Sequence, residues 1–158
     1  MRRVAFFAAL VFAFTTVVVG AQAVSAAPKH RAAVVVQHGD LVVHARCIRF
    51  KEAKISGLTM LKRSRMQYIA ARYAAGHTIC WLDGEGCKSS KPGTGAGTCF
   101  CDPVRFWGYW TREAGEPAPL LSGESPDARV VRDGSVDYWV WGVGQPPVPP
   151  MSIDDVCG

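Results

Sequence analysis

The chain has 158 residues, six of them cysteine, and a formal net charge of +5. Without its first 26 residues it keeps 16 Lys and Arg against 13 Asp and Glu, a net charge of +3. That length suits one domain with a core of its own. The mild charge excludes the strongly basic proteins that bind nucleic acid, so we expect no nucleic-acid partner.

The N-terminus has the layout of a secretory signal. Two arginines precede an uncharged apolar run, Val4 to Val19, and small residues follow in the order that signal peptidase accepts, up to Ala26. We predict a signal peptide over residues 1–26 and a single secreted, extracellular domain over residues 27–158. The alternative is an uncleaved anchor helix, because the apolar run is nearly long enough to span a bilayer. With cleavage, no membrane attachment remains.

An even number of cysteines in an exported chain indicates disulfides rather than free thiols. All six lie in the predicted mature part: Cys47, Cys80, Cys87, Cys99, Cys101 and Cys157. Cys99 and Cys101 are two residues apart and face the same side of a strand, so each should pair elsewhere. We predict three disulfides, with Cys157 pinning the C-terminal tail: Cys87 with Cys99, Cys80 with Cys101, and Cys47 with Cys157.

The first half of the mature chain predicts a hairpin and one helix. Ala33–Gln37 and Leu41–Phe50 are rich in β-branched or alternating residues, and the turn residues His38-Gly39-Asp40 join them. Ser56–Arg65 changes to helical spacing, with its serine as N-cap. Met66–Tyr73 either extends this helix or forms a third strand.

The second half reads as strands and loops. His77–Leu82 predicts a strand that Asp83-Gly84 closes, and residues 88–98 (KSSKPGTGAGT) predict a surface loop. Phe106–Thr111 predicts an aromatic strand, and Val130–Trp141 predicts a terminal hairpin around a tight turn. The expected fold class is therefore α+β, mainly β, with one short helix and disulfide staples.

No motif indicates catalysis. The chain lacks a nucleophile elbow, a zinc-protease motif and a phosphate-binding loop. His38, His44 and His77 could serve a histidine-dependent hydrolase, but hydrogen-bonded or exposed histidines explain them more simply. The cysteine spacings, C-x₆-C and C-x-C, differ from those of structural zinc sites. We predict a protein that is not an enzyme, with no metal and no cofactor.

Aromatic residues form the remaining pattern. Strand alternation places Trp139 and Trp141 on one face, and Trp107 and Trp110 on opposite faces. The simpler interpretation is that these rings fill the core beside the disulfides. The functional alternative is that outward rings form an apolar platform for a flat ligand or a partner, with arginines as anchors for an anionic group. The candidate ligand-binding residues are Trp107, Tyr109, Trp110, Trp139, Trp141, Arg105 and Arg112.

Four segments resemble the transcobalamin-like C-terminal domain family of secreted bacterial proteins. They are the hairpin Ala33–Phe50, the segment Gly57–Leu61, the stretch Phe106-Trp107-Gly108-Tyr109-Trp110, and Val131–Trp139 with its Asp-Gly turn. Ser135 stands where that family often has a second acidic residue. Another resemblance, to a small group of secreted bacterial proteins, lies in the cysteine pattern from Ile79 to Cys101.

The family resemblance implies a β-grasp framework and a non-enzymatic role. In the vitamin carriers this module covers one side of bound cobalamin. We therefore expect a secreted, non-catalytic binding module for a small flat ligand of corrinoid type or for a surface partner. The alternative is an extracellular interaction or inhibitor protein that inserts loop 88–98 into a partner such as a protease.

Overall fold

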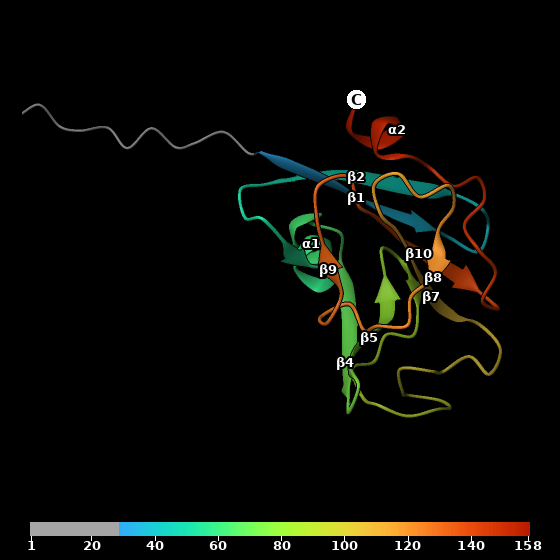
Figure 1. Ribbon diagram of the computed structural model, residues 1–158. Coiled ribbons are helices and arrows are strands. Elements are labelled where there is room, and N and C mark those ends of the chain that lie inside the picture. Colours follow the sequence, from blue (N-terminus) through green and yellow to red (C-terminus); the bar gives the residue numbers. More distant parts are fainter. Residues whose placement is uncertain (1–28) are drawn as a thin grey trace, which may run out of the picture.

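The computed structural model describes residues 29–158, so the predicted signal peptide lies outside the described residues. A five-stranded sheet with the order β2-β1-β10-β7-β8 forms its centre (Figure 1). β1 and β10 are parallel, and the other neighbours in the sheet are antiparallel. The strands are β1 His30–Gln37, β2 Val43–Phe50, β7 Phe106–Arg112, β8 Leu120–Leu121 and β10 Val136–Gly142.

This strand order defines a β-grasp-like domain. The β1–β2 hairpin leads into helix α1, Gly57–Arg63, and a late strand returns beside β1 in the middle of the sheet. Ser56 caps the helix as predicted, because its side chain accepts the backbone N–H of Thr59 at 3.1 Å. The predicted α+β, mainly β fold is confirmed.

A second helix was not predicted. The tail ends in α2, Ile153–Cys157, where Ser152 and Asp155 form a reciprocal capping box. Five residues are too few for periodicity to indicate a helix, and the prolines just before it point to extended chain.

Two small sheets complete the fold. One has the order β4-β5-β6 (Tyr68–Tyr73, Gly76–Leu82 and Glu85–Gly86), and the other pairs β3 with β9 (Ile55–Ser56 and Val130–Val131). Of the two alternatives predicted for Met66–Tyr73, a longer helix and a third strand, the strand is correct, because β4 lies there.

The predicted terminal hairpin is wrong. β9 pairs with β3, whereas β10 pairs with β1 and β7. The turn between them is tied to the start of β1, because Gly134 N–H donates to the Arg31 carbonyl at 2.8 Å and Arg31 N–H donates to Asp133 at 2.7 Å. Every residue of β10 is buried, which requires a central place in a sheet covered on both faces.

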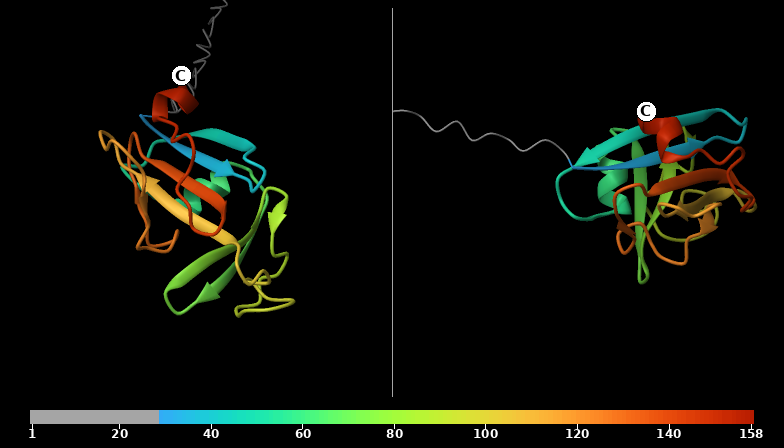
Figure 2. Two further views of the ribbon diagram at one scale, coloured as in Figure 1. Left: turned by 90° about the vertical axis from the view of Figure 1, so that its right-hand side faces the viewer. Right: turned by 45° about the horizontal axis from the view of Figure 1, so that its top comes forward.

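Both faces of the central sheet are covered (Figures 1 and 2). On the first face, Val34 and Val36 pack with four aromatic residues against α1 and the β4-β5-β6 sheet; these four are Trp107, Tyr109, Trp139 and Trp141. On the second face, Val35 and Tyr138 pack beneath the C-terminal tail. The tail side chains that cover this second face are Met151, Ile153 and Val156.

All six cysteines form disulfides. Cys47 pairs with Cys157, as predicted, and joins β2 to α2. The other two pairs are Cys80–Cys99 and Cys87–Cys101, the reverse of the prediction. Cys99 is buried in a cluster with Cys80, whereas Cys101 lies outside it and donates its backbone N–H to Cys87 Sγ at 2.9 Å.

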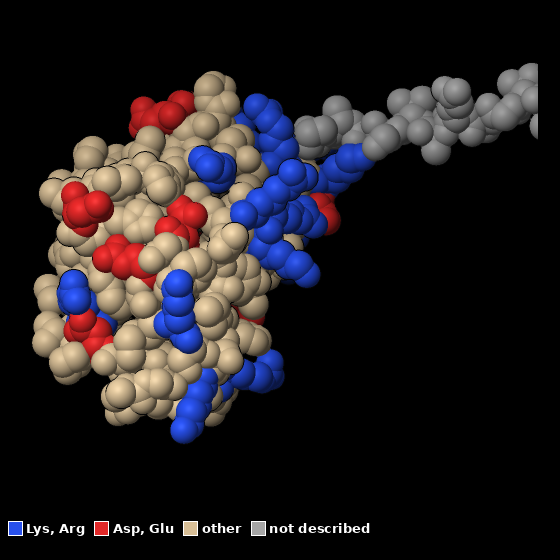
Figure 3. All heavy atoms as spheres, turned by 180° about the vertical axis from the view of Figure 1, so that it is seen from behind, with Lys and Arg blue, Asp and Glu red and all other residues tan. Residues whose placement is uncertain are grey.

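Three disulfides in so small a domain fit an oxidising, extracellular setting. Among residues 29–158, no helix has the length and apolar character needed to cross a membrane. Figure 3 shows the side opposite Figure 1, where Lys and Arg gather near the start of the described chain and Asp and Glu lie mainly elsewhere. Further Lys and Arg side chains lie among the acidic ones on this side, so it presents no uniformly charged surface.

Candidate binding site

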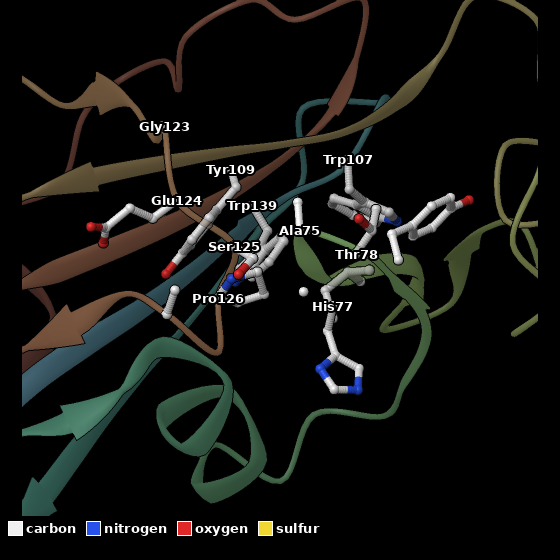
Figure 4. A pocket seen from close by; sticks show the side chains of 14 residues that line it. Ala75, His77, Thr78, Trp107, Tyr109, Gly123, Glu124, Ser125, Pro126 and Trp139 are labelled. Carbon is white, nitrogen blue, oxygen red and sulfur yellow. The ribbon is translucent and has the colours of Figure 1, made fainter.

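A cavity of about 490 Å³ opens on the first face of the central sheet. Trp107 and Tyr109 of β7 and Trp139 of β10 form its floor. Its walls come from the β4–β5 turn with the start of β5, residues 75–79, and from loop residues 123–128. In Figure 4 the three aromatic rings lie in one row, and His77 points away from them.

The rings of the floor are held in place by one another. Tyr109 stacks on Trp139 with ring centroids 4.2 Å apart and planes 14° apart. Trp107 packs against Trp141 at 5.4 Å and against His38 at 5.9 Å. Because each floor ring is at least nine-tenths buried, the cavity has a rigid aromatic floor rather than mobile side chains.

Three of the seven predicted ligand-binding residues therefore meet in one cavity. Trp141 belongs to the same cluster but does not line the cavity. Trp110 packs on the second face, and Arg112 also turns to the tail, donating to the Met151 carbonyl at 3.5 Å. Arg105 is exposed and forms an ion pair with Asp102 at 2.8 Å. Among the predicted aromatic residues, Trp107, Tyr109, Trp139 and Trp141 are thus buried on the first face, and Trp110 is partly buried on the second.

A buried polar network holds Tyr109 of the floor by its hydroxyl. The hydroxyl of Tyr109 donates to Asp137, which is only 1% exposed. Arg129, 8% exposed, faces the same carboxylate at 3.5 Å and forms a second ion pair with Glu113. Ser135 in turn donates to Glu113 at 2.7 Å. The serine that departs from the resembled family's acidic position is thus one end of this network.

Burial sets the electrostatics of this network. It raises the pKa of Asp137 to about 6, although the hydrogen bond from Tyr109 and the charge of Arg129 oppose the rise. Burial and the neighbouring Asp137 also raise the pKa of Tyr109, so its phenol stays protonated. Since the Tyr109 hydroxyl is engaged by Asp137, this residue offers the cavity its aromatic face alone.

The wall opposite the floor is fixed by a second polar contact. His77 donates its backbone N–H to Asp127 at 2.8 Å, and its Nδ1 lies 3.3 Å from the same carboxylate. The backbone hydrogen bond from His77 lowers the pKa of Asp127 to about 2. Trp107 Nε1 is buried with no hydrogen-bond partner among the described residues and lies close to Gly86 of β6, which does not line the cavity.

Comparison with known proteins supports the fold alone. No protein-family model matches the chain, and no curated protein does. A solved structure from Ruminococcus gnavus ATCC 29149 is similar with a TM-score of 0.51 and 18% sequence identity, covering 74% of this chain and 100% of that one. The R. gnavus structure is that of a "putative metal binding protein". Such low identity carries no information about binding by this chain.

Proposed function

We propose that the domain is a non-catalytic, extracellular binding module for a small, flat, mainly apolar ligand. The observation that carries this proposal is the convergence of Trp107, Tyr109 and Trp139 in one cavity of about 490 Å³. Small-molecule sites have this size and combine apolar walls with a few polar groups. A planar ring system would lie against this aromatic floor.

We also propose that the chain is related to the transcobalamin-like C-terminal domain family. Two of the four segments that resemble the family contribute to β7 and β10, the two strands that supply the floor of the cavity. A ligand of corrinoid type is therefore one member of the expected class, beside other planar ring compounds.

Closing the mouth of the cavity should abolish ligand binding. Ala75 is exposed and lines the cavity, whereas its neighbour Ala74 is also exposed and does not line it. We expect Ala75→Trp to weaken binding at least tenfold, a loss of about 1.4 kcal/mol, and Ala74→Trp to leave it unchanged. The measurement is quenching of tryptophan fluorescence during titration with a corrinoid, a porphyrin and a flavin.

Two results would count against the cavity as the binding site. One is that none of the three compounds gives a saturable change. The other is that a compound binds the Ala75→Trp variant as tightly as the unaltered chain while both variants remain folded by circular dichroism.

A second candidate function is protein recognition by loop 88–98. Disulfides Cys87–Cys101 and Cys80–Cys99 brace the chain on either side of this loop, and Gly93 N–H donates to the Tyr73 hydroxyl at 2.9 Å. The loop is thus an exposed, pre-ordered segment that presents Lys91. Pre-ordering reduces the entropy lost on binding, as an inhibitory loop requires.

An exposed lysine on a braced loop suits the acidic specificity pocket of trypsin-like proteases. If the loop inhibits such proteases, the chain should inhibit trypsin, and Lys91→Ala should raise the inhibition constant at least tenfold, by about 1.4 kcal/mol. Lys62→Ala, which removes an exposed lysine from α1, is the matched control and should change nothing. Failure of the unaltered chain to inhibit trypsin would eliminate this form of the second candidate.

A further inference from the structure

Two histidines and an aspartate meet outside the cavity described above. One ligand atom from each of His38, His44 and Asp83 lies within 4.8 Å of the other two. His38 directly follows β1, His44 lies in β2, and Asp83 lies in the turn between β5 and β6. The central sheet and the smaller β4-β5-β6 sheet thus each contribute to a single cluster, at the base of an open hollow lined also by Glu85.

The distances suit a divalent metal. His44 Nδ1 lies 2.5 Å from Asp83 Oδ2, and His38 Nε2 lies 3.9 Å from the same oxygen. In a tetrahedral zinc site the ligand atoms lie about 2.0 to 2.2 Å from the metal and so roughly 3.3 Å from one another. The two separations bracket that value, and small movements of the exposed His44 and the half-buried Asp83 side chains would bring the ligand atoms toward it.

Glu85 sets the orientation of His38. Its Oε2 lies 3.0 Å from His38 Nδ1 and accepts the backbone N–H of Gly39 at 2.9 Å. A carboxylate at Nδ1 favours the tautomer with its proton there, which leaves a lone pair on Nε2. Metal-binding histidines are commonly held in this way by an outer carboxylate.

The lone pair of His38 has no partner in the described chain. Nε2 is buried without a hydrogen bond, and the group that it faces, Asp83 Oδ2, is itself an acceptor. Two acceptors 3.9 Å apart repel each other unless a cation or a proton lies between them. This unpaired nitrogen is the observation that distinguishes the cluster from an ordinary surface ion pair.

Asp83 is held in a backbone conformation that few non-glycine residues adopt. Asp83 adopts φ of +49°, in the left-handed region, and Gly84 follows with φ of +108°. Aspartate and asparagine tolerate this region better than most residues. The turn directs the carboxylate toward the two histidines of the neighbouring sheet, and replacement by asparagine retains the turn while removing the charge.

We propose that His38, His44 and Asp83 form a binding site for a divalent transition-metal ion, Zn²⁺ in the first place. Two imidazole nitrogens favour such an ion over Mg²⁺ or Ca²⁺, which prefer oxygen ligands. The metal would displace the proton that His44 and Asp83 share and would bond His38 Nε2 directly. Three protein ligands and an open hollow leave a fourth position for water or an external ligand.

Calorimetric titration of the full, untagged, EDTA-treated chain with ZnCl₂ tests the site. We expect 1:1 binding that His44→Ala and Asp83→Asn each weaken at least about tenfold, and that Glu85→Gln weakens by roughly 10- to 100-fold through loss of His38 orientation. His77→Ala is the matched control: it removes a histidine that also faces an aspartate, Asp127, but that lies outside the cluster, and it should bind like the unaltered chain.

A second measurement reports the place of binding. His38 packs edge-on against Trp107, with centroids 5.9 Å apart, so Cu²⁺ at the cluster should quench tryptophan fluorescence in the unaltered chain and in His77→Ala, and not in Asp83→Asn. Absence of saturable Zn²⁺ binding would overturn the proposal. So would His44→Ala and Asp83→Asn variants that bind Zn²⁺ as tightly as the unaltered chain. Ala75→Trp should retain Zn²⁺ binding, so the two sites can fail independently.

Discussion

Replacing Cys47 and Cys157 together by alanine should lower the free energy of unfolding by about 4 to 5 kcal/mol. This disulfide closes a loop of 110 residues and is the longest cross-link of the three. In the chain-entropy account, its removal frees the unfolded chain more than either short loop does. It also releases α2, which packs with Met151 over the second face of the central sheet.

The matched comparison is Cys87→Ala with Cys101→Ala. That disulfide closes a loop of only 14 residues, and its loss should lower the free energy of unfolding by about 3 kcal/mol. Urea denaturation of both double variants under non-reducing conditions gives the two values. An effect of the Cys47–Cys157 pair equal to or smaller than that of the Cys87–Cys101 pair would show that the tail contributes little to the stability of the fold.

Local features of this fold could be predicted from the sequence. The β1–β2 hairpin and α1 form from neighbouring residues, so alternation, turn residues and the Ser56 cap are sufficient to indicate them. The pairing of β1 with β10 joins residues about a hundred positions apart, and no local pattern specifies it. The terminal hairpin was therefore predicted from its turn, although β10 belongs beside β1.

The candidate sites show the same limit. The aromatic residues of β7 and β10 and their alternation were evident, but the burial of those on the first face depends on α1 and the β4-β5-β6 sheet, which come from distant parts of the sequence. The cysteine pairs were reversed because spacing alone does not show that Cys99 is buried and Cys101 exposed. His38 and Asp83 each stood in a predicted turn, yet only the packing of two sheets brings them together.

Arg129→Met should lower the free energy of unfolding by about 3 to 5 kcal/mol at pH 7. Arg129 is the cation that compensates the buried carboxylate of Asp137 and also pairs with Glu113. Methionine has a similar length and fills the space, but it leaves Asp137 with the Tyr109 hydroxyl as its remaining partner in the network. Chemical denaturation of the variant and the unaltered chain measures the difference.

The double variant with Asp137→Asn separates charge from packing. Removing both charges of a buried pair is often nearly neutral, whereas removing one leaves the other uncompensated, so the second substitution should restore most of the lost stability. Asparagine can still accept the hydroxyl of Tyr109, which keeps the stacked ring beneath the cavity in place.

The loss of stability in Arg129→Met should depend on pH through the ionisation of Asp137. Burial raises the pKa of Asp137 in the folded chain to about 6, above its unfolded value of about 4. Between these two pH values the folded state binds more protons than the unfolded state, so the stability lost to the buried carboxyl grows as the pH rises from about 4 and is complete above about 6. Loss of Arg129 raises this pKa further, so Arg129→Met should be less destabilising at pH 5 than at pH 7. A loss of stability that is equal at both pH values, and that Asp137→Asn does not relieve, would mean that Arg129 acts through its packing and not through its charge.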